Sequence, residues 1–189
     1  MKKSYIIIGV IVVIILAIIM IFVSSYNGLV TLEESVDNKY ADVEVQLERR
    51  ADLVPNLVNT VKGYADHEDE AIEKVTTARE NLVNAKGIEE QAEANNELTG
   101  ALNDLMVIVE NYPDLKASQN FINLQDELAG TENRISTARR DYNAAVKEYN
   151  AKIKKIPTNI IASISGFEEK EYFEADDSKK EVPEVDFSE

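Results

Sequence analysis

A run of 19 residues without a charge, Tyr5 to Val23, constrains this chain more than any other feature of its sequence. As a helix it would span roughly 28 Å, close to the ~30 Å hydrocarbon core of a bilayer. The run is longer than the apolar part of a cleaved signal peptide, and Val23 to Ser25 match a cleavage site poorly. The chain contains no cysteine, which excludes a lipoprotein anchor. We therefore expect an uncleaved, single-pass transmembrane helix.

The charges that flank this run predict its orientation. Lys2 and Lys3 precede it, and the first charges that follow are acidic, from Glu33 onward. Because lysine and arginine favour the cytoplasmic side of a membrane, we expect the N-terminus inside and residues 27–189 outside the cytoplasm. The reverse orientation, with the helical part facing the cytoplasm, remains open.

The composition excludes several kinds of functional site. Without cysteine there is no thiol catalysis, and the single histidine, His67, removes most zinc and Ser-His-Asp schemes. A net charge of −15 argues against nucleic acid as a partner. No phosphate-binding loop, nucleophile elbow or paired-acid motif is present. We expect no enzymatic activity, no catalytic residues, no cofactor and no metal, and we assign His67 to Glu70 to a helix start.

Apolar residues recur at steps of three, four and seven over most of the remaining chain, which predicts an all-α fold. The pattern marks helices near 26–64, 68–86, 88–111 and 114–156, and short connections make sequential helices antiparallel. We predict an N-terminal single-pass transmembrane helix followed by a long antiparallel four-helix bundle with coiled-coil spacing. Two long outer helices would flank two shorter inner ones.

The chain divides into five predicted parts. They are a short N-terminal flank (1–4), a transmembrane anchor (5–25), the helical bundle (26–156), a membrane-proximal apolar segment (157–173) and an acidic tail (174–189). The tail is rich in acids and poor in apolar residues, so we expect it to be disordered.

Pro55 interrupts the first bundle helix. Its missing N–H leaves the Ala51 carbonyl without a helical partner, and its ring is expected to bend the helix. A level pairing of Ala65 with Pro113 would place the nearby arginines opposite Asp126 and Glu127, as surface pairs. The alternatives here are a structural bend with solvated charges and a partner surface formed by Arg49, Arg50, Pro55 and Asn56.

A Tyr-Asn pair occurs three times, and the antiparallel register places all three near the membrane. Tyrosine combines an apolar ring with a polar tip, which suits both a bilayer interface and a helix seam. The alternatives are packing or anchoring and a docking patch for a partner protein. The residues are Tyr26, Asn27, Tyr142, Asn143, Tyr149 and Asn150.

The segment from Ile156 to Phe167 is apolar, nearly uncharged and returned toward the membrane by the last bundle helix. Lipid is the nearest apolar phase. We therefore expect this segment to lie on the bilayer surface or to cap the base of the helices. The candidate membrane contacts are Ile160, Ile161, Ile164 and Phe167.

Four stretches of the chain resemble the LemA family of bacterial membrane proteins. They are "YNGLV" at 26–30, "VEVQLERRADLVPNLVNTVKGYADHE" at 43–68, "ENYPDLKASQNFINLQDELAGTENRISTARRDYNAAVKEYN" at 110–150 and "IPTNIIASISGFEEKEYF" at 156–173. The resemblance covers about Lys2 to Phe173, and it departs at Ile156, where an aromatic residue is expected. It implies one N-terminal membrane helix and a long antiparallel helical bundle, and it supplies no activity.

These observations favour a non-enzymatic, membrane-anchored helical scaffold or adaptor at the bacterial cell envelope. Its expected partners are the lipid bilayer and other membrane or envelope proteins, such as a membrane protease that needs an accessory subunit. A homo-oligomer stays open. The alternatives are a cytoplasm-facing signalling or sensory adaptor, if the topology is reversed, and a hydrolase with an unrecognised carboxylate site.

Overall fold

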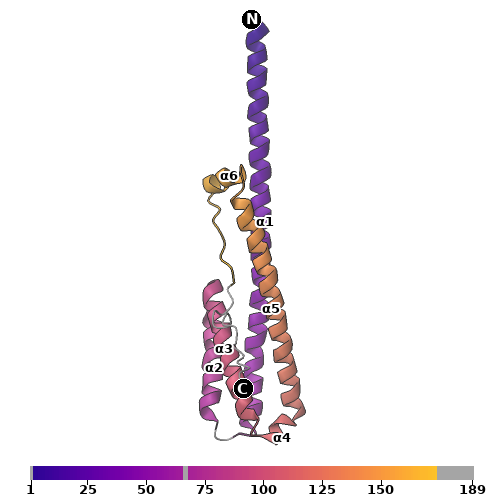
Figure 1. Ribbon diagram of the computed structural model, residues 1–189, viewed down its shortest axis with the longest axis vertical. Helices are drawn as coiled ribbons and strands as arrows, with labels where there is room; N and C mark the ends of the chain where they lie inside the picture. The colour runs from indigo at the N-terminus through magenta and orange to yellow at the C-terminus, as the bar shows by residue number, and fades with distance from the viewer. Residues whose placement is uncertain (1, 66–67, 174–189) are drawn as a thin grey trace, which may run out of the picture. The chain divides into compact units, whose positions relative to one another are not determined.

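A computed structural model of the chain describes residues 2–65 and 68–173, and every regular element in this part is an α-helix (Figure 1). The all-α prediction is confirmed. His67 and the acidic tail, 174–189, lie outside the described residues, so the expectations about them stay predictions. The helices are α1 Lys2–Lys62, α2 Asp69–Asn84, α3 Gly87–Val109, α4 Pro113–Lys116, α5 Gln119–Ile153 and α6 Thr158–Ser165.

Helix α1 contains the apolar run and continues for 61 residues to Lys62 without a break. The side chains from Tyr5 to Val23 are exposed, so this run forms no part of a protein core. Among the described residues, α1 is the one helix long and apolar enough to cross a membrane. The predicted boundary between anchor and bundle, after residue 25, therefore falls within one continuous helix.

The chain forms two compact units, which we describe separately. The anchor unit comprises residues 2–40 and 141–171, and the hairpin unit comprises residues 41–140 with 172–173. Because α1 and α5 are long, each of them contributes residues to both units.

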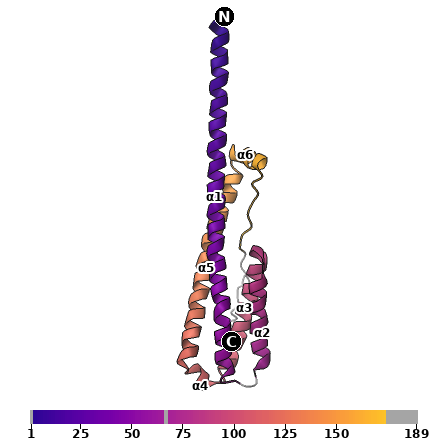
Figure 2. The same cartoon turned by 180° about the vertical axis from the view of Figure 1, so that it is seen from behind.

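In the anchor unit, the first part of α1 and the last part of α5 lie side by side in both views (Figures 1 and 2). Tyr40 and Tyr142 meet across this pair with ring centroids 5.9 Å apart. After α5 the chain turns into the short helix α6, which ends at Gly166 in the left-handed conformation (φ 77°) that glycine adopts without strain. The buried side chains of the pair that carry apolar or aromatic groups are Leu29, Val36, Tyr142, Val146 and Tyr149.

In the hairpin unit, α2 and α3 form an antiparallel hairpin joined at Ala85 and Lys86. Their boundaries agree with the prediction to within two residues, because each carries a regular apolar stripe between turn signals. The core also receives side chains from α1 and α5. Its large members include Leu47, Val54, Leu57, Val61, Ile72, Val75, Leu82, Leu98, Leu105, Phe121, Leu128 and Ile135.

The predicted fourth helix, 114–156, is divided into α4 and α5. Pro113 begins α4, where its missing N–H costs nothing. The chain then turns at Ala117 and Ser118, and the Ser118 carbonyl accepts the Ile122 N–H at 3.0 Å as α5 begins. Sequence periodicity missed this break because the apolar spacing resumes within a few residues.

Candidate functional site

Pro55 lies inside α1, and the backbone group that it leaves without a helical partner is satisfied by a side chain of α2. In a regular helix the Ala51 carbonyl would accept a hydrogen bond from the N–H of residue 55, which proline lacks. Instead, Arg79 Nε donates to this carbonyl oxygen at 2.8 Å. Ala51 is buried, so an unsatisfied acceptor there would cost about 1–3 kcal/mol. The contact therefore joins α1 to α2.

Arg50 is buried, with 4% of its surface exposed, whereas its neighbour Arg49 is exposed. Its Nη1 donates to Asn95 Oδ1 on α3 at 2.6 Å and lies 2.6 Å from Glu132 Oε2 on α5. Burial lowers the pKa of the Arg50 guanidinium, and the nearby Glu132 carboxylate acts in the opposite direction. A guanidinium is basic enough to stay charged. Arg50 therefore joins three helices through one charged group.

The expected surface pairs of the arginines with Asp126 and Glu127 are replaced by the pair of Arg50 with Glu132. In an antiparallel helix pair, the residue numbers of level residues have a constant sum. The expected pairing of Ala65 with Pro113 gives 178, whereas Arg50 and Glu132 give 182, an offset of about one helical turn. Tyr40 and Tyr142 have the same sum. The expected pairing assumed one helix from residue 114 onward, whereas the chain forms α4 and a turn before α5 begins at Gln119.

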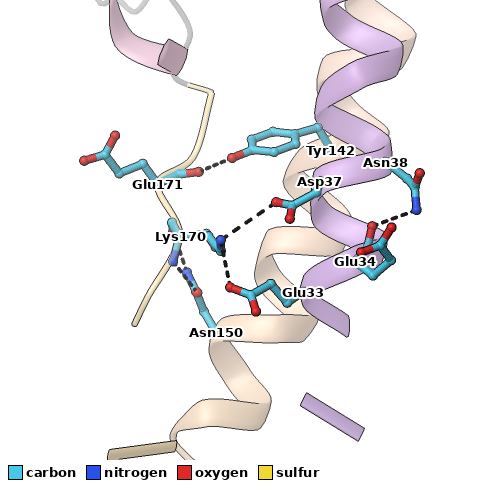
Figure 3. Close-up of polar contacts among 8 residues, drawn as sticks. All are labelled: Glu33, Glu34, Asp37, Asn38, Tyr142, Asn150, Lys170 and Glu171. Carbon is cyan, nitrogen blue, oxygen red and sulfur yellow. Dashed lines mark hydrogen bonds and ion pairs between the residues drawn. The ribbon is translucent and has the colours of Figure 1, made fainter. Parts of the chain in front are cut away.

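In the anchor unit, polar side chains of α1 and α5 hold an extended segment, Phe167–Glu171, which we call the strap (Figure 3). The Asn150 amide makes two hydrogen bonds to the backbone of Lys170: Nδ2 donates to its carbonyl at 2.8 Å, and its N–H donates to Oδ1 at 2.9 Å. The Tyr142 hydroxyl donates to the Glu171 carbonyl at 2.8 Å. These contacts hold the backbone of the strap whatever its side chains are.

The Lys170 side chain adds a charged contact to the strap. Its Nζ lies 3.0 Å from Glu33 Oε1 and 3.8 Å from Asp37 Oδ1, two residues one turn apart on α1 (Figure 3). The ammonium also lies 6.0 Å from the centroid of the Tyr149 ring, within the range of a cation–π contact. We call Glu33, Asp37, Tyr142 and Asn150 the clasp. Sequence reasoning missed Lys170, because an extended segment carries no periodic signal.

The three Tyr-Asn pairs occupy different environments. Tyr142, Tyr149 and Asn150 are buried, Asn143 is half-buried, and Tyr26 and Asn27 are exposed. Burial raises the pKa of Tyr142 and of Tyr149 to about 12, so both hydroxyls stay protonated at neutral pH. The second and third pairs therefore supply residues that pack inside the anchor unit and hold the strap.

Helix α6 is held next to the end of the apolar run. Phe167 packs edge-on against Tyr26, with ring centroids 5.6 Å apart, and Tyr26 stacks on Phe22 at 6.5 Å. One face of α6 is buried through Ile161 and Ala162. The opposite face is apolar and open to solvent, because Ile160 is 57% exposed and Ile164 73%. Of the four candidate membrane contacts, Ile160 and Ile164 are thus accessible, while Ile161 and Phe167 pack against the chain.

Only part of the predicted partner surface near Pro55 is accessible. Arg49, Pro55 and Asn56 are exposed on α1, whereas Arg50 is committed to contacts inside the hairpin unit. No group of three or more histidine or acidic side chains with a geometry that could hold a metal ion occurs in residues 2–65 and 68–173.

Comparison with known proteins identifies similar chains. The LemA family model matches residues 39–187. The magnetosome protein MamQ 2 of Paramagnetospirillum magneticum is 30% identical over 186 residues, which cover 85% of this chain and 68% of the relative. MamQ of Magnetospirillum gryphiswaldense is 30% identical, over 78% of this chain and 64% of the relative. Protein LemA of Metamycoplasma hominis is 27% identical, over 75% of this chain and 65% of the relative.

Proposed function

The chain belongs to the LemA family, and from that premise we propose that it is a non-enzymatic, membrane-anchored helical scaffold of the bacterial cell envelope. The observation that carries this proposal is the exposed apolar run of α1, which continues as one helix into the folded part of the chain. The names of the relatives, LemA and MamQ, refer to no reaction, which is consistent with a non-enzymatic role.

The scaffold that we propose contains an antiparallel four-helix bundle in the hairpin unit and a helix pair in the anchor unit. Two contacts in the hairpin unit support the bundle. Arg50 joins α1 to α3 and α5, and Arg79 joins α2 to α1. Because buried polar groups tolerate few alternative arrangements, these contacts would fix how the helices align.

We propose that protein partners bind the exposed side of α1 at Arg49, Pro55 and Asn56, which carry no buried contact. The test is photo-crosslinking in cells from a reactive residue placed at Asn56, with Val83 on α2 as a matched exposed control. A defined envelope protein crosslinked from Asn56 and absent from the Val83 control supports the scaffold. Equal, diffuse labelling from both positions contradicts it.

We propose that α6 is a second contact with the bilayer, through Ile160 and Ile164. The Tyr26–Phe167 contact supports this, because it holds α6 three residues beyond the end of the apolar run. An exposed apolar face in that position loses contact with water when it enters the lipid interface.

For the orientation, we propose that residues 27–189 lie outside the cytoplasm, as Lys2 and Lys3 indicate. The absence of cysteine allows a clean test: a single cysteine replaces Glu73, an exposed residue of α2. Labelling of intact cells by a membrane-impermeant maleimide supports this orientation. Labelling only after lysis supports the reverse.

The second candidate function is the cytoplasm-facing adaptor, and one observation favours it. Lys152 and Lys155 lie in the anchor unit on the other side of the apolar run from Lys2 and Lys3, in one cleft with Ser24 and Ser25. Lysines beside a membrane are favoured in the cytoplasm, where anionic lipids are abundant. The maleimide experiment decides between the two orientations.

A further inference from the structure

A cleft of about 490 Å³ lies in the anchor unit where the apolar run of α1 ends. One side of it belongs to α1, and the other to the end of α5 and the turn before α6. Figures 1 and 2 both show these segments next to each other. The residues that line the cleft are Met20, Ile21, Ser24, Ser25, Lys152, Lys155, Ile156, Pro157 and Thr158.

The cleft has an apolar part and a polar part. Met20 and Ile21 belong to the apolar run, and Ile156 is 83% exposed, so this part offers bare hydrocarbon surface. The polar part is lined by Ser24 and Ser25 of α1 and by Lys152 and Lys155. A ligand that fits both parts has an anionic group attached to an apolar chain.

The two lysines are available for an anionic ligand. Their neighbour Lys154 is paired with Glu169 at 2.8 Å. Lys152 and Lys155, by contrast, make no ion pair with the residues that the structure describes. Lys152 and Lys155 line the same cleft, and the charges of two lysines without a carboxylate partner favour an anion there.

The depth of the cleft in a membrane follows from the apolar run. If Tyr5 to Val23 span the hydrocarbon core, Ser24 and Ser25 lie at the level of the lipid headgroups. Met20 and Ile21 then lie among the acyl chains. The lysines are at the level where a phospholipid carries its phosphate, and basic pockets beside spanning helices bind such headgroups.

We propose that this cleft binds an anionic membrane phospholipid, with the phosphate held by Lys152 and Lys155 and an acyl chain along Met20, Ile21 and Ile156. This inference rests on the proposed membrane anchoring. It adds a specific lipid class to the contacts of the protein, and it explains why the turn before α6 exposes a large apolar side chain beside two cations.

The test is lipid retention by the full chain, purified in a neutral detergent and measured by native mass spectrometry. Equal amounts of phosphatidylglycerol and phosphatidylcholine with the same acyl chains are added. Each lysine near a headgroup contributes roughly a fivefold preference for the anionic lipid. We therefore expect at least about tenfold preference in the parent chain, and near-equal retention in the Lys152→Gln, Lys155→Gln variant.

A matched control carries the same loss of charge elsewhere: Lys62→Gln with Lys147→Gln, both exposed and outside the cleft. It should keep the preference of the parent chain. Circular dichroism checks that all variants keep their helix content, and glutamine preserves the length of each side chain.

Three results would overturn the proposal. They are equal retention of both lipids by the parent chain, an unchanged preference in the Lys152 and Lys155 variant, and displacement of the lipid by millimolar inorganic phosphate, which would show that the acyl chain adds nothing. A chain that stays soluble after removal of the detergent contradicts the membrane anchoring itself. A chain that needs detergent but retains both lipids equally contradicts only the cleft.

Discussion

The two units of the molecule use polar side chains for different purposes. In the hairpin unit, Arg50 and Arg79 join one helix to another from buried or half-buried positions. In the anchor unit, Asn150 and Tyr142 hold an extended strap against a helix pair. The first arrangement determines whether the helices pack. The second fixes the position of the extended segment that follows the helices. Four predictions test this difference.

The largest effect is expected at Arg50. Replacing Arg50 by methionine keeps the apolar stem but leaves the Asn95 oxygen buried without its donor, which should lower the free energy of unfolding by about 2 kcal/mol. The Glu132 side chain is 44% exposed, but its Oε2, the atom that meets Arg50, is buried, so the loss of the guanidinium there adds to this cost. Thermal unfolding followed by circular dichroism measures the change. Arg49→Met is the control, with an expected change within about 0.5 kcal/mol. Equal losses at both positions would contradict the buried role of Arg50.

The contact of Arg79 with the Ala51 carbonyl exists because Pro55 cannot donate to it. Arg79→Met should therefore lower the free energy of unfolding by about 1 kcal/mol in the parent chain. In a Pro55→Ala background, residue 55 can donate its own N–H to Ala51, so the same Arg79 change should cost clearly less. The measurement is a double-mutant cycle by thermal unfolding. Strictly additive changes would show that the proline and the arginine are independent.

Loss of the contacts that hold the strap should affect the strap alone and leave the rest of the fold intact. Asn150→Ala removes two hydrogen bonds to Lys170, each worth about 1 kcal/mol, so exchange of the Lys170 amide hydrogen should accelerate roughly tenfold or more. Hydrogen exchange of the full chain measures this. Asn38→Ala, which removes a side-chain bond within α1, is the control and should leave the strap unchanged. The unfolding temperature should fall less than for Arg50→Met. A global loss of the same size would contradict a purely local role.

The smallest effect at neutral pH concerns the buried tyrosines. The pKa of Tyr142 in the folded chain is about 12, above the ordinary value near 10. Its contribution to stability is therefore complete below pH 10 and is lost as the pH rises from 10 to 12. Absorbance at 295 nm should show late titration of Tyr142 and Tyr149, and Tyr142→Phe should remove one late step. Titration of all tyrosines near pH 10 in the folded protein would contradict the burial of Tyr142 and Tyr149.

The sequence predicted the helices because their signals are local. The uncharged run, the apolar stripes and the prolines identified the apolar helix, α2 and α3 without information from distant residues. The burial of Arg50 was missed, although one signal was available. The apolar stripe of α1 passes through positions 43, 47, 50 and 54, so Arg50 occupies a core position of that stripe.

The strap was beyond sequence reasoning for a physical reason. Its contacts join Lys170 to Asn150, 20 residues away, and to Glu33 on another helix. An extended segment held by side chains has no period of its own. The repeated Tyr-Asn pair is visible in the sequence, but only the fold separates its buried members from the exposed Tyr26 and Asn27.

The proposed contact of the anchor unit with the bilayer at both α1 and α6 is tested most directly at α6. An environment-sensitive fluorophore is attached to a single cysteine at Ile164 in the full chain, reconstituted in lipid vesicles, with a second preparation labelled at Glu73. If α6 meets the bilayer, emission at Ile164 is blue-shifted and is reduced by lipid-borne quenchers, whereas emission at Glu73 is water-like. Water-like emission at both positions would contradict this contact.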